Sequence, residues 1–134
     1  MGANTITEIN PTNAEIKFIR ESYEHCAAFL AICGGFMAPL RSGIYEGKTA
    51  TAPRFLLDNL RKESPGVTWV DRRWQQDGKL WTSGTLLNGL DCMQAFARQT
   101  WNPTKGEFVE AMLSIGSWPV RDEEYKDVGV NRKM

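Results

Sequence analysis

The chain has 134 residues, with 16 basic and 16 acidic side chains and therefore no formal net charge. Because no basic excess or Lys/Arg cluster stands out, neither nucleic acid nor a membrane is an expected partner, and the apolar stretches are shorter than the ~20 residues of a membrane span. Its cysteines, Cys26, Cys33 and Cys92, have neither the number nor the spacing of a disulfide framework or a CxxC metal site, so we expect a reduced, cytoplasmic protein.

The chain is predicted to begin with a helix and a buried strand. Thr12 followed by Glu15 is a capping-box pattern, which predicts a helix over residues 13–24. The apolar run 27–32 is short and continuous, as in a parallel strand that is buried on both faces. A helix to about Ser42 is expected after it.

The later sequence predicts further strands and three more helices. Asp77-Gly78 is a strong hairpin turn signal between two β-leaning segments. The predicted elements are a strand at 49–52, a helix at 53–62, strands at 67–70, 73–76 and 79–83, and helices at 86–101 and 104–115, the last opened by a Thr104/Glu107 capping-box pattern. We expect a single domain at 1–117, followed by a charged and loosely ordered tail at 118–134.

Cys33 is the main candidate functional residue, because it begins a Cys-Gly-Gly turn between the predicted strand and helix. The positive end of a helix dipole at such a turn favours the thiolate over the thiol. The glycines permit a tight turn, and the backbone N–H groups of Gly34 and Gly35 are candidates to hold an anionic intermediate. The pattern indicates a nucleophile elbow that carries sulfur in place of a hydroxyl.

Four segments of the chain carry a family resemblance. They are AICGG at 31–35, SGIYEGKTAT at 42–51, DGKLWTSG at 77–84 and LNGLD at 87–91. In this order and spacing they resemble the DJ-1/PfpI (ThiJ) superfamily, and within it the isonitrile-hydratase-like branch. The resemblance implies a flavodoxin-like (class I glutamine amidotransferase-like) α/β three-layer sandwich with a mainly parallel sheet, a cysteine at the elbow and a homodimer. It covers about residues 14–101, so the opening βα elements of the domain are expected to be missing and the fold to be truncated at its N-terminus.

The chain also departs from the family pattern. Family members place a carboxylic acid from an early strand beside the cysteine, and no upstream glutamate here follows a buried strand. The glyoxalase and deglycase branch has a histidine where this chain has Ala52. The protease-like branch has a histidine, and the hydratase branch usually a threonine, where this chain has Gly34. The acid partner of Cys33 is therefore not assigned.

Two classes of function remain open. In the first, the Cys33 thiolate attacks a small electrophile, and a hydratase or lyase converts an isonitrile to an N-substituted formamide, or acts on a reactive carbonyl, without cofactor or metal. In the second, the chain is a non-catalytic member that senses redox state through Cys33 or binds a partner. A truncated remnant that folds only as an oligomer is a third possibility.

Other polar residues are given structural roles. His25 lies at the opposite end of the predicted strand from Cys33, so neither a Cys–His dyad nor a metal site is expected. Thr82, Ser83 and Gly84 end a strand at the same edge as the elbow, where they could line a pocket or cap a helix. Asp91 is expected on a helix surface or in a cap. The five tryptophans could form a ligand platform, but the three in the β-hairpin segment, Trp69, Trp74 and Trp81, are expected to pack in the core or an interface.

Overall fold

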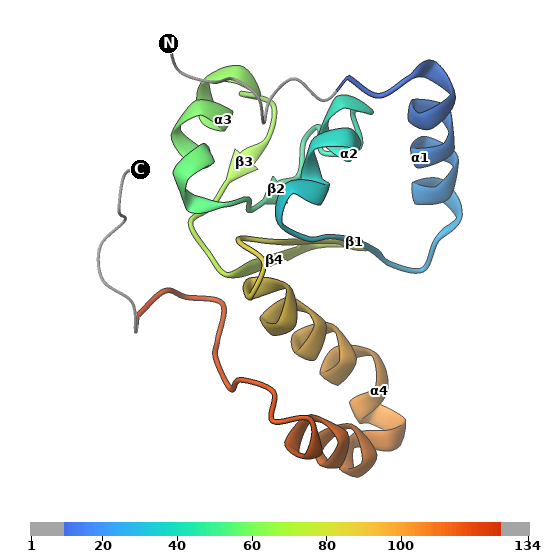
Figure 1. Ribbon diagram of the computed structural model, residues 1–134. Helices are drawn as coiled ribbons and strands as arrows, with labels where there is room; N and C mark the ends of the chain where they lie inside the picture. The colour runs from blue at the N-terminus through green and yellow to red at the C-terminus, as the bar shows by residue number, and fades with distance from the viewer. Residues whose placement is uncertain (1–9, 127–134) are drawn as a thin grey trace.

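The computed structural model describes residues 10–126, which form helices on both sides of short strands (Figure 1). In chain order the elements are α1 (Asn13–His25), β1 (Phe29–Ala31), the 3₁₀ helix η1 (Cys33–Phe36), α2 (Met37–Arg41), β2 (Thr49–Ala50), the 3₁₀ helix η2 (Arg54–Leu56), α3 (Leu57–Glu63), β3 (Thr68–Trp69), β4 (Trp74–Asp77), β5 (Leu80–Ser83) and α4 (Asn88–Ile115). In Figure 1, α1, α2 and α3 lie above the strands and α4 lies below them. The predicted α/β class is confirmed.

Helix α1 begins at the predicted capping box. The Glu15 N–H donates to the Thr12 hydroxyl oxygen at 3.2 Å, and the Thr12 N–H donates to a Glu15 carboxylate oxygen at 2.7 Å. These bonds satisfy backbone donors that have no partner within the first turn of a helix. The Thr12 N–H and hydroxyl both donate to the Glu15 carboxylate, and because these bonds favour its ionised form they lower the pKa of Glu15.

The larger sheet has the order β1-β5-β4, with β5 in the centre. Strand β1 runs parallel to β5, with Ala31 opposite Thr82. Strands β4 and β5 form the predicted hairpin, in which Asp77 pairs with Leu80 and Gly78 turns the chain at φ +60°. All residues of β5 are buried, as expected for a strand with both faces covered.

Strands β2 and β3 form a separate, two-stranded parallel sheet. Side-chain oxygens join this sheet to the larger one. The Thr51 N–H donates to Thr82 Oγ1 at 2.9 Å, and the Thr49 N–H donates to Asp77 Oδ2 at 2.7 Å. Because side-chain oxygens accept these backbone donors, a backbone ladder does not continue between the two sheets. A single, mainly parallel sheet is therefore not confirmed: the sheets are small, and the larger one is mixed.

Aromatic side chains organise the interior on both sides of the strands. Trp69 packs edge-on against Phe36 and stacks on Tyr45, with ring centroids 6.1 and 6.0 Å away. On the α4 side, stacked or edge-on contacts run from Trp74 through Trp81 and Phe96 to Trp101. Buried apolar residues of the main core are Ala31, Phe36, Tyr45, Ala50, Ala52, Leu56, Leu57, Leu60, Val67, Trp69 and Leu80. The packing role predicted for Trp69, Trp74 and Trp81 is confirmed.

Helix α4 is interrupted at Lys105, whose backbone is not helical (φ −142°, ψ 33°). The sequence predicts a division between two helices at residues 102–103, and the break lies two residues after it. The Thr104 hydroxyl donates to the Trp101 carbonyl oxygen at 3.4 Å, a different partner from the predicted capping box. A bidentate ion pair between Arg98 and Glu110, at 2.7 and 3.0 Å, joins the segments before and after the break. Within residues 10–126, no helix has the length and hydropathy that crossing a bilayer requires.

After α4 the chain returns toward the strands (orange-red in Figure 1). We call residues 118–126 the C-terminal strap. The Trp118 N–H donates to the Leu113 carbonyl oxygen at 3.1 Å, and the Arg73 N–H donates to the Glu123 carbonyl oxygen at 2.7 Å. This part of the expected loose tail is thus held by specific contacts. Residues 127–134 of that tail lie outside the described residues.

Candidate functional site

Cys33 is the first residue of η1, in the turn that follows β1, and it has a left-handed backbone, with φ +52°. For a residue with a Cβ, this conformation costs about 1–2 kcal/mol. Cys33 is partly exposed, so solutes can reach it. A 3₁₀ turn and the five-residue α2 follow, in place of the regular helix that the sequence predicts. The strand–turn–helix order of a nucleophile elbow is present, with a short helical part.

The end of β5 lies beside this turn. The Cys33 N–H donates to Ser83 Oγ at 3.4 Å, and Ser83 is fully buried. Because β1 and β5 are parallel, with Ala31 opposite Thr82, they end at the same edge of the sheet. The predicted proximity of Ser83 to the elbow is confirmed. The Thr82 hydroxyl instead accepts the Thr51 N–H and so connects the two sheets.

The backbone amides of the two glycines differ in their surroundings. The Gly35 N–H donates to the Ile32 carbonyl oxygen at 2.9 Å, so an anion at Cys33 would compete with that carbonyl. At Gly34, a Cβ would lie 3.4 Å from the terminal carbon of Met37, a side chain that approaches the backbone closely. The anion-holding role of Gly34 and Gly35 stays a prediction.

The C-terminal strap covers the edge at which β5 ends. The Tyr125 hydroxyl donates to Asn88 Oδ1 at 2.8 Å, and it lies 2.6 Å from the place that a Cβ on Gly84 would take. Burial raises the pKa of Tyr125 to about 12, so this hydroxyl stays protonated at neutral pH. The Arg54 guanidinium lies over the Tyr125 ring, 4.4 Å from its centroid. A side chain at residue 84 would displace the Tyr125 hydroxyl or the Asn88 side chain, so the glycine leaves room for Tyr125 at this edge.

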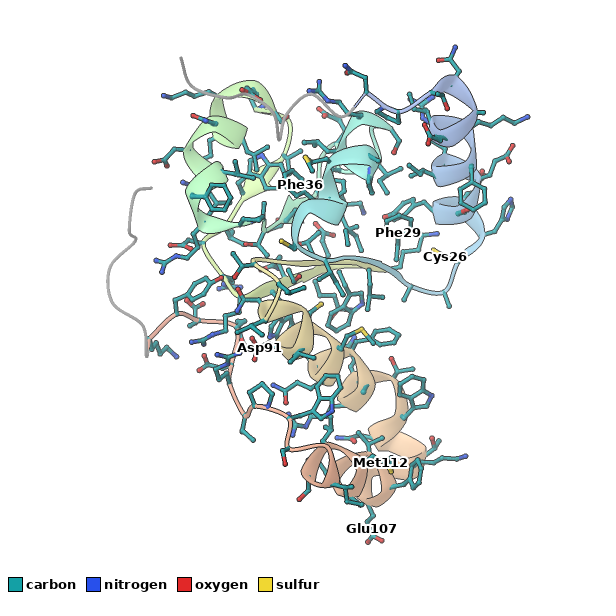
Figure 2. The ribbon with its side chains drawn as sticks, in the orientation of Figure 1. Cys26, Phe29, Phe36, Asp91, Glu107 and Met112 are labelled. Carbon is teal, nitrogen blue, oxygen red and sulfur yellow. The ribbon has the colours of Figure 1, made fainter. Side chains whose placement is uncertain are left out.

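Asp91, labelled in Figure 2, anchors the strap to α4. It is fully buried, and its carboxylate oxygens accept two hydrogen bonds from the Arg121 guanidinium, at 3.0 and 2.9 Å. The Asn88 side-chain amide donates a further bond to it at 3.2 Å. Asp91 lies in the first turn of α4, but the predicted helix-surface position is wrong, because Asp91 is fully buried and its partner Arg121 lies 30 residues away along the chain. No local pattern in the sequence relates residues at that separation.

The other candidate residues are not gathered at the elbow. Cys92 is buried in α4, and this burial, together with the neighbouring Asp91 carboxylate, raises the pKa of its thiol to about 12. His25 is exposed in the last position of α1. In the described part of the chain, no group of three or more His, Cys, Asp or Glu residues is placed to hold a metal ion. The site therefore consists of Cys33, its turn and the buried Ser83.

Comparison with solved structures shows which fold this site belongs to. DJ-1beta of Drosophila melanogaster superimposes with a TM-score of 0.66 and 18% identity, over 87% of this chain and 59% of that one. Schizosaccharomyces pombe DJ-1 superimposes with a TM-score of 0.64 and 20% sequence identity, over 88% of this chain and 58% of that one. An AraC family transcriptional regulator from Pseudomonas putida superimposes with a TM-score of 0.62 and 14% sequence identity, over 84% of this chain and 68% of that one. These identities show a shared fold, and the chain spans about three-fifths of the two DJ-1 structures.

The sequence comparisons identify the family. None of the curated protein sequences compared with the chain matches it. A model of the DJ-1/PfpI family matches residues 2–99, which is more than half of the chain and includes β1, the Cys33 turn and β5. The chain therefore belongs to the DJ-1/PfpI family.

Proposed function

We propose that this chain acts on a small electrophile through the Cys33 thiol, as a hydratase or a related lyase. The observation that carries the proposal is the left-handed backbone of Cys33, φ +52°, in the turn after β1. Such conformations persist in residues with a Cβ only where the surrounding structure enforces them, and they are concentrated at functional sites. The partial exposure of Cys33 gives a substrate access to it.

The proposed substrate is an isonitrile or a reactive carbonyl compound. With an isonitrile, the Cys33 sulfur bonds to the terminal carbon while that carbon gains a proton, which gives a thioimidate. Water then adds to the same carbon, and the carbon–sulfur bond breaks to release an N-substituted formamide and the thiol. The sum is the addition of one water molecule, which needs no oxidant, reductant, organic cofactor or metal.

Groups of the turn have assigned roles in this chemistry. We assign the Gly34 N–H to the charge that develops on the adduct, with the Gly35 N–H contributing when it leaves the Ile32 carbonyl oxygen. Within residues 10–126, no carboxylate is hydrogen-bonded to Cys33, whose backbone donates to Ser83. The proton therefore comes from solvent in this proposal.

Alkylation with iodoacetamide, followed site by site by mass spectrometry, tests the reactivity of Cys33. Cys26 is the internal control, because it is also partly exposed, and its thiol is 3.5 Å from the Tyr23 carbonyl oxygen, to which it donates. Cys92 is the negative control, since it is buried with a pKa raised to about 12. We expect labelling of Cys33 at pH 7 to be about tenfold faster than that of Cys26, and Cys92 to stay unlabelled.

Turnover of an alkyl isonitrile and of a small aldehyde separates the candidate functions. The hydratase proposal expects consumption by the wild type and by Cys26→Ser, and none by Cys33→Ser. Labelling of Cys33 no faster than that of Cys26, or unchanged turnover by Cys33→Ser, would overturn it. Fast labelling without turnover of either substrate would also overturn it, and would favour the redox-sensing alternative, in which the thiol oxidises to sulfinate.

The proposal includes a compartment and an assembly state. Cys26, Cys33 and Cys92 are all free thiols, which suits the reducing cytoplasm. We further propose a homodimer, as the family resemblance implies. Light scattering coupled to size-exclusion chromatography tests it: a mass of twice 15.1 kDa is expected, and a monomeric mass across micromolar concentrations contradicts it.

A further inference from the structure

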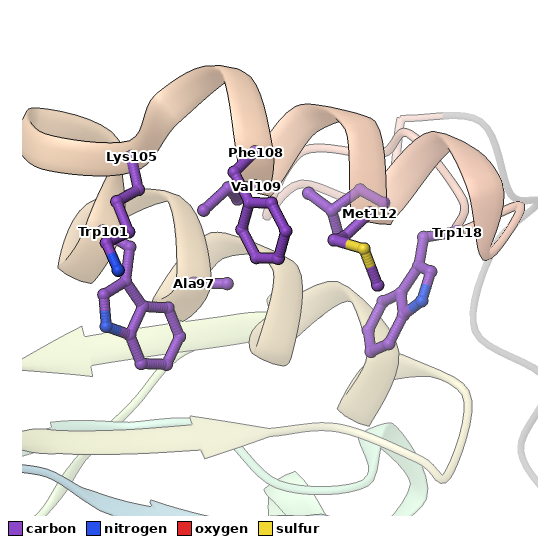
Figure 3. Close-up of a pocket in the computed structure, with 8 residues that line it drawn as sticks. Ala97, Trp101, Lys105, Phe108, Val109, Met112 and Trp118 are labelled. Atoms are coloured by element: carbon purple, nitrogen blue, oxygen red, sulfur yellow. The ribbon is translucent and has the colours of Figure 1, made fainter.

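A cavity of about 490 Å³ lies between the two segments of α4 and the beginning of the C-terminal strap (Figure 3). Side chains that line it include Trp101, Lys105, Phe108, Val109, Met112 and Trp118. None of the residues 32–35 of the Cys33 turn lines it. Its volume falls within the range of about 300–1,000 Å³ that is usual for small-molecule sites.

The walls of this cavity are fixed by contacts outside its lining. The bidentate pair between Arg98 and Glu110 ties the two segments of α4 together, at 2.7 and 3.0 Å. At the strap, a Cβ on Gly116 would lie 2.6 Å from Trp118, whose indole thus packs closely on the backbone. A preformed site of this kind binds a ligand without a large ordering cost.

The lining combines apolar surface with one cation. Trp101, Phe108 and Met112 remain 46, 64 and 50% exposed, so a ligand in the cavity would remove apolar surface from water. Lys105 is the charged residue of the lining, and it forms no ion pair with a carboxylate in the described part of the chain. In Figure 3, Lys105 and Trp101 lie at one end, and Met112 and Trp118 at the other. The two ends therefore differ in charge and in polarity.

We propose that this cavity binds an amphipathic organic anion, a medium-chain carboxylate, with its carboxylate at Lys105 and its chain reaching toward Met112 and Trp118. The flexible thioether of Met112 can adapt to an alkyl chain, and the Lys105 ammonium supplies the charge-assisted hydrogen bond that the carboxylate needs. A second protein copy is the less suitable occupant, because lysine is depleted from the cores of protein interfaces.

Binding of sodium decanoate below its micelle concentration tests the site, by calorimetry and by quenching of tryptophan fluorescence. The wild type is expected to bind one decanoate per chain. Lys105→Gln is expected to weaken decanoate binding by about tenfold, the loss of one charge-assisted hydrogen bond, and to change decanol binding less than about twofold. Lys62→Gln is the matched control, because Lys62 is an exposed lysine on α3, and it should bind decanoate as the wild type does.

A second variant and two further outcomes make the test decisive. Met112→Trp fills the cavity and is expected to abolish binding of both decanoate and decanol, with circular dichroism confirming that it folds. Cys33→Ser is expected to bind decanoate normally, which separates this site from the proposed chemistry at Cys33. No saturable binding, or equal losses for decanoate and decanol in Lys105→Gln, would overturn the proposal. So would a dimer that forms through this face and is dissociated by Met112→Trp.

Discussion

Among single residues, Cys33 has a left-handed backbone that disfavours its own side chain, as Ser117 also does. Its φ of +52° brings the Cβ close to the following carbonyl oxygen, whereas the neighbouring Gly34 has no Cβ to constrain. A glycine at position 33 would adopt this left-handed backbone without strain, but the turn would then lack its thiol. The chain thus bears a conformational penalty at the one residue that places a thiol at the end of β1.

This penalty can be measured directly. Cys33→Gly is expected to raise the free energy of unfolding by about 0.5–1 kcal/mol, because glycine adopts a left-handed backbone without steric clash. Cys33→Ser keeps the Cβ and should stay within about 0.5 kcal/mol of the wild type. Urea denaturation followed by circular dichroism provides the values.

Cys26→Gly serves as the control for Cys33→Gly. Cys26 has φ −78°, where glycine relieves nothing and only adds freedom to the unfolded chain, so this variant should lose stability. If Cys33→Gly and Cys26→Gly are equally destabilised, the backbone of Cys33 is not strained.

At the level of elements, α4 places two glycines in contrasting surroundings. A Cβ on Gly89 would lie 2.6 Å from Ile32 Cγ2, a methyl group of a stiff β-branched side chain that cannot easily move away. A Cβ on Gly106 would meet only the Asn102 side chain, at 3.6 Å or more. The first glycine lets α4 approach the strand end that leads into the Cys33 turn, and the second has no such role.

Alanine at these two positions is expected to change stability in opposite directions. Gly89→Ala should lower the free energy of unfolding by about 1–3 kcal/mol, through steric overlap with Ile32. Gly106→Ala should raise it by about 0.5–1 kcal/mol, because alanine has the higher helix propensity. Thermal and urea unfolding of the two variants checks this, and a stabilised Gly89→Ala variant would show that α4 does not pack closely at Ile32.

Elements whose signals are local were predictable from the sequence. The Thr12/Glu15 capping box and the Asp77-Gly78 turn each act within four residues, so their patterns are readable and both form in the structure. The division of the strands into two sheets could not be predicted from the sequence. It depends on side-chain oxygens of Thr82 and Asp77, which accept hydrogen bonds from backbone N–H groups 28 or more residues away. The Cys33 turn was predictable in part. Its glycines indicate a turn at this position in the sequence, whereas the contact between Cys33 and Ser83 depends on the register between β1 and β5.

Across the whole molecule, contacts of long range hold the C-terminal strap. Arg121 pairs with Asp91, and the Arg73 guanidinium donates to the carbonyl oxygens of Asp122 and Glu124. Arg73 is itself almost fully buried. Each charged side chain that the strap covers therefore meets a complementary group there, as burial of charge requires.

Removal of Arg121 is expected to destabilise the fold far more than removal of a surface cation. Arg121→Ala leaves the buried Asp91 carboxylate without its partner and should lower the free energy of unfolding by about 3 kcal/mol. Lys17→Ala breaks the exposed pair with Glu21 and should cost less than about 0.5 kcal/mol.

The double variant Asp91→Asn/Arg121→Gln removes both charges and should recover part of the loss of Arg121→Ala. Urea unfolding of the wild type, Asp91→Asn, Arg121→Gln and this double variant forms a double-mutant cycle, which measures the coupling between Asp91 and Arg121. Equal effects of Arg121→Ala and Lys17→Ala would show that the strap is not anchored through Asp91.

The position of Arg121 also has a consequence for synthesis of the chain on the ribosome. Asp91 leaves the exit tunnel 30 residues before Arg121, when β1, β4 and β5 are already available to pair. Until Arg121 emerges, the nascent chain holds a carboxylate that cannot be buried without its counter-ion, so α4 cannot complete its packing on the sheet. Co-translational folding around α4 therefore finishes only after Arg121 has left the exit tunnel.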